Sequence, residues 1–298
     1  MTEPSPISPA PKPLSNMRLA DWGMLVLCAV FWGSAYTFNK VTLAEMPTLT
    51  ITAVRLLIAA SVLYLFARWS GVAIPPPGPA WRPFFVFTLF SNILPFMLVL
   101  NGQRQTASGL AAVLGATTPL FLILLAHLYT HDERLVLRKF IGVLVGLAGV
   151  AVVVGTDAFA GWSSALGAKL SLVFAAFIYA VGAIYSKRLI GHPPLVIATM
   201  QMTCGMIVAM PFALAIDQPW TLTTPSSKAL LALVATATLG SAMASVTYFN
   251  VFRRAGAVNA MLVTLLVPVT PILLGSLFLG DVDQFSCLPG AQGPPGAT

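Results

Sequence analysis

Nine stretches of the chain are nearly free of charge, and each is long enough to form one membrane-spanning helix. The second is interrupted by Arg55. A helix crosses the hydrocarbon core with about 20 apolar residues, and a backbone in lipid must satisfy its own hydrogen bonds, which favours helices. We therefore expect nine spans, at about 22–42, 48–68, 83–103, 108–130, 137–156, 163–187, 195–216, 229–252 and 257–280.

Composition supports an all-α polytopic membrane protein in contact with the lipid bilayer. Charged residues make up 8% of the chain, against about 25% in a soluble domain. The net charge of +7 does not indicate a nucleic-acid partner, because the basic residues lie at helix ends and not on one face. The three cysteines form no C-x-x-C pair or Cys/His cluster, so we expect neither a metal site nor a cofactor.

Basic residues also predict the orientation of the chain. If the N-terminus is cytoplasmic, eleven Lys and Arg residues fall in inner segments and four in outer segments, as the positive-inside rule requires. Residues 1–18 are rich in proline and contain no apolar run, so we expect a disordered cytoplasmic lead and not a cleavable signal.

One pattern occurs twice in the chain. A helix rich in small residues carries an aromatic side chain, ends in a lysine and is followed by a proline seven residues later. The matched pairs are Trp32 and Tyr179, Lys40 and Lys187, and Pro47 and Pro194. We interpret 19–156 as a first repeat of five helices and 160–281 as a second repeat of four, which lacks its last helix. An odd number of helices inverts the second repeat relative to the first, as in many secondary transporters.

Two prolines interrupt apolar helices at matching places in the repeats. Pro119 lies in the fourth expected span and Pro268 in the ninth. Matched interrupted helices are a pointer to the substrate site of a transporter. The alternative is that each proline only kinks its helix, which is common in membranes.

Arg55 is the strongly charged residue expected within a span. An ionisable group in the membrane is costly and usually faces the interior of the helix bundle. Arg55 could attract a substrate carboxylate, or it could serve the fold by bonding to helix-end carbonyl groups. The sequence slightly favours the structural role.

Other polar and aromatic side chains are candidates for the substrate pathway. Trp32, Tyr36 and Tyr179 lie on the first helices of the two repeats, where they could form the walls of a site or simply pack. Polar side chains inside apolar helices could line the pathway or bond between helices. These polar candidates are Asn92, Thr118 and Asn250.

Several motifs together resemble the EamA-type family of the drug/metabolite transporter superfamily. They are Trp32-Gly33-Ser34, Thr106 through Pro119, Asp132-Glu133-Arg134-Leu135, Arg253 through Ala257, and Leu266 through Val269. The resemblance implies ten helices with both termini in the cytoplasm of a bacterium. It also implies transport of small organic metabolites, often amino acids, and often outward across the inner membrane.

The sequence departs from this family pattern after Gly280. A polar tail rich in proline and glycine, 282–298, stands where a tenth helix is expected. We interpret the tail as disordered and as the product of a frameshift or premature end, the alternative being a genuine tail on a shortened transporter.

Three functions follow from these observations. The first is a secondary transporter that moves small organic molecules by alternating access between its repeats. The second is an inactive or regulatory membrane protein, because a helix is missing. A membrane enzyme is the weakest, since no convergent catalytic set is visible. The small-residue face Gly142-x-x-x-Gly146 predicts close helix packing or a homodimer surface.

Overall fold

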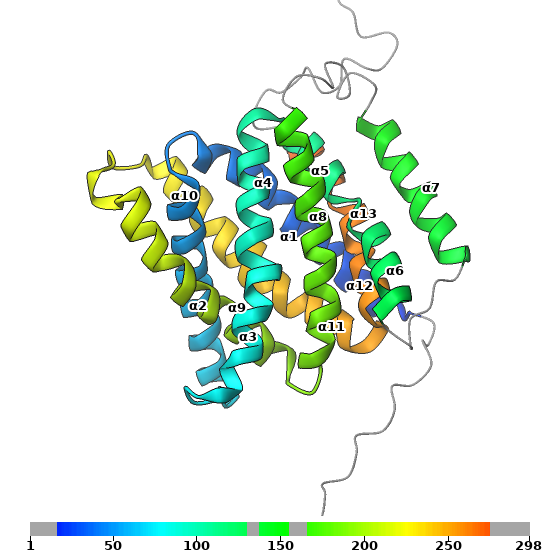
Figure 1. The fold of residues 1–298 in the computed structure, drawn as a ribbon, viewed down its shortest axis with the longest axis horizontal. Helices are drawn as coiled ribbons and strands as arrows, with labels where there is room; N and C mark the ends of the chain where they lie inside the picture. Colours follow the sequence, from blue (N-terminus) through cyan, green and yellow to red (C-terminus); the bar gives the residue numbers. More distant parts are fainter. Residues whose placement is uncertain (1–16, 130–136, 155–165, 275–298) are drawn as a thin grey trace, which may run out of the picture.

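The computed structural model describes residues 17–129, 137–154 and 166–274, and every regular element in these ranges is a helix (Figure 1). Seven helical segments are long and apolar enough to cross a membrane, and one shorter apolar segment covers Ala257–Pro271. The all-α polytopic class is therefore confirmed. Residues 1–16 of the expected lead over 1–18 lie outside the described residues, as does the expected tail over 282–298.

The helices of the first half follow the expected spans within a few residues. The third and fourth spans are each built from shorter pieces, and α7 coincides with the fifth expected span. In chain order they are α1 Leu19–Leu43, α2 Thr48–Trp69, η1 Pro79–Trp81, α3 Arg82–Thr88, η2 Leu89–Ile93, α4 Leu94–Gln105, α5 Ser108–Gly115, α6 Thr118–Tyr129 and α7 Leu137–Val154.

The second half repeats this order of pieces. Its last three helices are short, and they account for the described part of the ninth expected span. In chain order they are α8 Leu166–Ser186, η4 Lys187–Leu189, α9 Pro194–Phe212, η5 Ala213–Asp217, η6 Pro219–Thr221, α10 Ser227–Ala235, η7 Thr236–Met243, α11 Ala244–Ala255, α12 Ala257–Met261, α13 Val263–Leu266 and α14 Val269–Leu274.

The third and eighth spans each contain a segment of π-helix, η2 and η7. Pro95 lacks the N–H that would bond to the carbonyl of Ser91 four residues earlier, which favours the wider turn in η2. In η7 the hydroxyl of Ser241 donates to the carbonyl of Thr236, five residues earlier, at 3.1 Å. Segments of π-helix are uncommon and occur frequently at functional sites.

The two halves interlock by exchanging partners. The helix α1 packs against η7 and α11 of the second half, α4 packs against α8, and α2 packs along α9. The first span thus meets the eighth, the sixth meets the third, and the second meets the seventh. This reciprocal pattern is what two related halves produce when they face one another.

Close backbone crossings occur at equivalent places in the two halves. A Cβ added at Gly240 of η7 would lie 2.9 Å from the Cβ of Ala35 on α1. A Cβ added at Gly182 of α8 would lie 2.8 Å from the carbonyl oxygen of Phe90 in η2. Gly182 follows Ala35 by 147 residues, the spacing that also separates Lys40 from Lys187. Small residues bring α1 and α8 close to the π segments of the opposite halves.

Both proline-containing helices are interrupted beside the proline. In the first half the chain breaks between α5 and α6, and in the second half between α13 and α14. Pro119 has no N–H for the carbonyl of Gly115, and the hydroxyl of Thr118 donates to that carbonyl instead, at 2.7 Å. A side chain therefore satisfies the backbone group that the proline leaves free.

Hydrogen bonds also connect the halves at the end of the bundle that holds the α1–α2 and α9–α10 connections. A carboxylate oxygen of Asp217 accepts bonds from the backbone N–H and the hydroxyl of Thr50, at 2.7 and 2.8 Å. The carboxylate of Glu45 accepts bonds from the backbone N–H and the hydroxyl of Ser226, at 2.6 and 2.7 Å. Each carboxylate caps or approaches the N-terminus of a helix, where negative charge is favourable.

Candidate functional site

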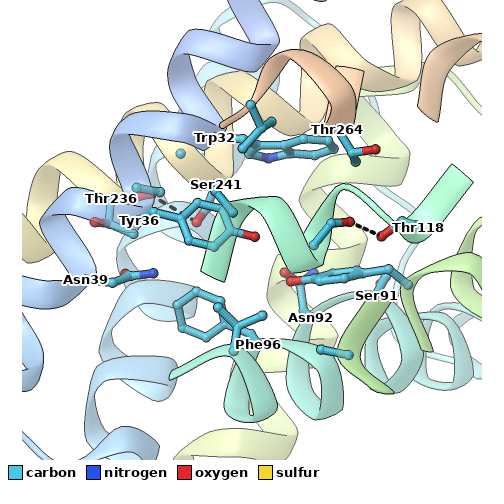
Figure 2. A pocket seen from close by; sticks show the side chains of 18 of the residues that line it. Trp32, Tyr36, Asn39, Ser91, Asn92, Phe96, Thr118, Thr236, Ser241 and Thr264 are labelled. Carbon is cyan, nitrogen blue, oxygen red and sulfur yellow. Dashed lines mark hydrogen bonds between the residues drawn. The ribbon is translucent and has the colours of Figure 1, made fainter. Parts of the chain in front are cut away.

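A cavity of about 140 Å³ lies where the two halves meet. Side chains of α1, α2, η2, α4, α5 and α6 line it from the first half, and α8, α9, η7, α11, α12 and α13 line it from the second. Figure 2 shows Trp32 at one end of the view and Phe96 at the other, with Tyr36 and Ser241 between them. The π segments η2 and η7 and both interrupted helices contribute to the walls.

Arg55 is the cation of this cavity, and it is held by both halves. Its side chain is 4% exposed. One terminal nitrogen, Nη1, donates to the hydroxyl of Ser241 in η7 at 2.7 Å, and the other, Nη2, lies 3.4 Å from the amide oxygen of Asn92 in η2. The guanidinium carbon also lies 3.7 Å from the centroid of the Phe96 ring, within the range of a cation–π interaction.

None of these contacts supplies a negative charge. Ser241 and Asn92 are neutral, and the described residues that line the cavity include neither aspartate nor glutamate. A buried cation normally has a paired anion, because the loss of its hydration is costly. Among the described residues, the charge of Arg55 is offset by the dipoles of Ser241 and Asn92 and by the face of the Phe96 ring.

Several buried polar atoms around the cavity have no hydrogen-bond partner among the described residues. Two are donors, Arg55 Nε and Asn92 Nδ2, and three are oxygens, Asn39 Oδ1, Gln201 Oε1 and Thr236 Oγ1. Unsatisfied polar groups are rare in the interior of a protein and require an explanation. Their concentration at one cavity is what a site for a polar ligand requires.

Aromatic side chains provide the apolar part of the wall. Trp32 on α1 packs against Tyr248, with ring centroids 5.3 Å apart. The hydroxyl of Tyr36 lies next to Gly115, where an added Cβ would approach it to 2.8 Å. Tyr179 lines the cavity from α8. Such a wall suits a ligand with a flat or apolar body.

A second cavity of about 70 Å³ adjoins the first. The two share six lining residues, among them Trp32, Tyr179 and Gln201. The amide nitrogen of Gln201 donates to the hydroxyl of Ser91 at 2.8 Å, which holds this part of the shared wall in place. Beyond it the second cavity extends to Tyr248 and Phe249.

The structure brings six of the nine predicted pathway residues to the main cavity. These are Trp32, Tyr36, Arg55, Asn92, Thr118 and Tyr179. Pro119 and Pro268 are buried next to lining residues. Asn250 lies outside the lining, where its side chain donates to the carbonyl of Val246 within α11 at 2.8 Å. The roles of all nine in transport stay predictions.

Sequence reasoning missed three important neighbours of the site. Ser241 follows Asn92 by 149 residues, the spacing that separates Pro119 from Pro268, so the repeat itself could have indicated Ser241. Gln201 is a polar residue in an apolar span and carried the same signal as Asn92. Phe96 carried no signal, because an aromatic residue in a membrane helix is ordinary.

The family model of the EamA-like transporter family matches residues 22–155 and, a second time, residues 166–284. The chain belongs to this family. Each match covers one half of the interlocked bundle and contributes one of the two π segments that meet at Arg55.

Relatives with curated names agree with this assignment. The chain is 26% identical over 260 residues to the uncharacterized inner membrane transporter YedA of Escherichia coli strain K12, covering 87% of this chain and 83% of that one. It is 21% identical over 272 residues to the uncharacterized transporter YoaV of Bacillus subtilis strain 168, covering 90% and 91%. The protein is therefore a multi-pass inner-membrane transporter of the EamA-like family.

A solved crystal structure shows the same fold. It matches with a TM-score of 0.69, covering 94% of this chain and 92% of the other at 19% identity. At this identity the likeness describes the architecture of the bundle only.

Proposed function

We propose that this protein is a secondary transporter that binds a small organic metabolite in the central cavity and exports it by alternating access. Amino acids and related compounds are the cargo that we favour. The observation that carries the proposal is the cavity itself, because its wall is shared between two interlocked halves and contains the matched interrupted helices. Substrate sites between the halves of a transporter have this construction.

Alternating access requires that the halves move while the site stays between them. The pairs α1 with η7 and α8 with η2 place a close crossing at a glycine next to the two cavities. Such crossings let helix backbones slide or tilt with few bulky contacts to break. Bonds such as those of Asp217 and Glu45 connect the halves at one end of the bundle, and opening there would have to release them.

A tolerance screen can test the proposal. Cells that overproduce the protein and cells that lack it are grown with inhibitory concentrations of amino acids, their analogues and other small metabolites. Overproduction should protect against the exported class, and purified protein in liposomes should then move the same compound. Failure to move any compound that alters growth would contradict the proposal.

A matched pair of variants tests whether the measured transport depends on the cavity. Ser245 on α11 lines both cavities, and Ser245→Leu should reduce transport strongly because it fills the site. Thr247→Leu makes a similar change two residues away, where the hydroxyl donates to the carbonyl of Met243 in the same span and Thr247 is not part of the lining. It should leave transport close to the wild-type rate, and an equal loss in both variants would argue against the cavity as the site.

A further inference from the structure

Arg55 and Asn92 present two buried donors next to each other at the cavity. Among the residues that the structure describes, Arg55 Nε and Asn92 Nδ2 have no hydrogen-bond partner, while Asn92 Oδ1 already faces the guanidinium at 3.4 Å. A carboxylate accepts several hydrogen bonds and pairs well with the planar guanidinium group. An anion here would both satisfy these donors and neutralise the cation.

The equivalent position in the second half of the chain carries no charge. The spacing of 147 residues that relates Pro47 to Pro194 places Met202 at the position equivalent to Arg55. Met202 is also buried and also lines the cavity, and α9 packs there without any charge. The positive charge therefore distinguishes one half of an otherwise related pair.

The rest of the cavity limits the size and charge of the ligand. A cavity of about 140 Å³ is comparable to an engineered cavity of about 150 Å³ that binds benzene. The described lining offers neutral acceptors such as Gln201 Oε1, but no carboxylate for a ligand cation. Trp32, Tyr179 and Phe96 offer flat apolar surfaces for the remainder of the molecule.

We infer that Arg55 and Asn92 form an anion subsite that binds the carboxylate group of the ligand, and that the ligand also carries an apolar body of about one ring. This inference rests on the proposed function, because it names the class of substrate that the transport site would bind. It assigns the Arg55 guanidinium to the ligand carboxylate and the aromatic wall to the ligand body.

Binding in detergent tests the subsite without requiring transport. The probes are benzoate, its neutral amide benzamide, and the cation benzylammonium, each titrated calorimetrically into the purified full-length protein. Benzoate should bind, while benzamide and benzylammonium should bind at least about tenfold more weakly, since neither of them brings a negative charge to the hydrogen bonds of the guanidinium group. Equal binding of benzoate and benzamide, or no binding of benzoate, would overturn the inference.

Two variants locate the subsite. Arg55→Gln should weaken benzoate binding by about tenfold or more, while Arg68→Gln, exposed in the last turn of the same helix, should have no effect. Asn92→Asp is the second test, because it supplies an internal carboxylate beside the guanidinium. This variant should fold well and lose benzoate binding. Wild-type affinity in Asn92→Asp would refute the subsite even if Arg55→Gln does not fold.

Flux measurements separate this inference from the proposed function. If the protein in liposomes transports a neutral or cationic compound and benzoate does not compete, the transporter proposal stands and the anion subsite fails. If benzoate binds through Arg55 but no anion crosses the membrane, the subsite stands and the transporter proposal fails.

Discussion

Replacing Gly182 by alanine should destabilise the fold, because this glycine lies where α8 crosses η2. An added Cβ would lie 2.8 Å from the carbonyl oxygen of Phe90, 3.1 Å from its carbonyl carbon and 3.4 Å from the backbone nitrogen of Ser91. These are backbone atoms, which cannot rotate away as the end of a side chain can. Either α8 or the π segment would have to shift.

The change in the free energy of unfolding of Gly182→Ala follows from two opposing effects. Replacing a glycine inside a helix with alanine stabilises the helix by about 0.8–1.0 kcal/mol. Overpacking a tight contact costs about 1–3 kcal/mol. Gly142 on α7 provides the matched control, because an added Cβ there meets nothing within 4 Å. The difference between the two variants therefore isolates the steric cost of about 1–3 kcal/mol.

The assay is thermal unfolding in detergent, followed by far-ultraviolet circular dichroism. About 2–4 °C of melting temperature corresponds to each kcal/mol in a chain of 150–250 residues, so the two variants should differ by several degrees. Gly142→Ala should melt at or above the wild-type temperature and Gly182→Ala below it. If Gly182→Ala melts as high as Gly142→Ala, the close crossing of α8 and η2 is wrong.

Three further predictions concern side chains that make defined hydrogen bonds. The Ser226 hydroxyl and N–H hold the pKa of Glu45 below its usual value. The Glu45 carboxylate therefore stabilises the folded protein above a pH of about 4.3, and this stabilisation is lost as the pH falls through the lowered pKa. The difference in melting temperature between the wild type and Glu45→Gln should shrink in acid. Asp217→Ala removes a cap of α2 and should cost about 0.5–2 kcal/mol, measured by denaturant unfolding. Thr118→Val leaves the carbonyl of Gly115 without its hydroxyl donor and should cost about 1 kcal/mol, whereas an unchanged midpoint would mean that the interrupted helix does not depend on this bond.

Most of the helix boundaries were predictable, because charge and hydropathy alone decide which segments can enter lipid. Leu19–Leu43 and Thr48–Trp69 lie within three residues of the expected spans. The interruptions at Pro119 and Pro268 were also visible, since a missing N–H acts locally. The π segments were not predicted, because charge and hydropathy do not distinguish a π turn from an α turn, and the close crossing of Gly240 in η7 with Ala35 becomes visible only in the structure.

The candidate site was predicted in part, and the reason is geometric. A polar residue inside an apolar span is conspicuous, so Arg55, Asn92 and Tyr179 could be found without coordinates. Their convergence could not, since it depends on which spans become neighbours. Asn250 has the same sequence signature as Asn92, yet it bonds within its own helix. Asn92 reaches the cavity and Asn250 does not because the two side chains point in different directions from their helices.

The double attachment of Arg55 has a mechanical consequence. Its guanidinium is bonded to Ser241 in one half and faces Asn92 in the other, so the head group bridges the boundary along which the halves meet. Any rocking of one half against the other must lengthen at least one of these contacts. The contacts of Arg55 therefore depend directly on the distance between the halves. A ligand that competes for these hydrogen bonds would change the free energy needed to move one half against the other.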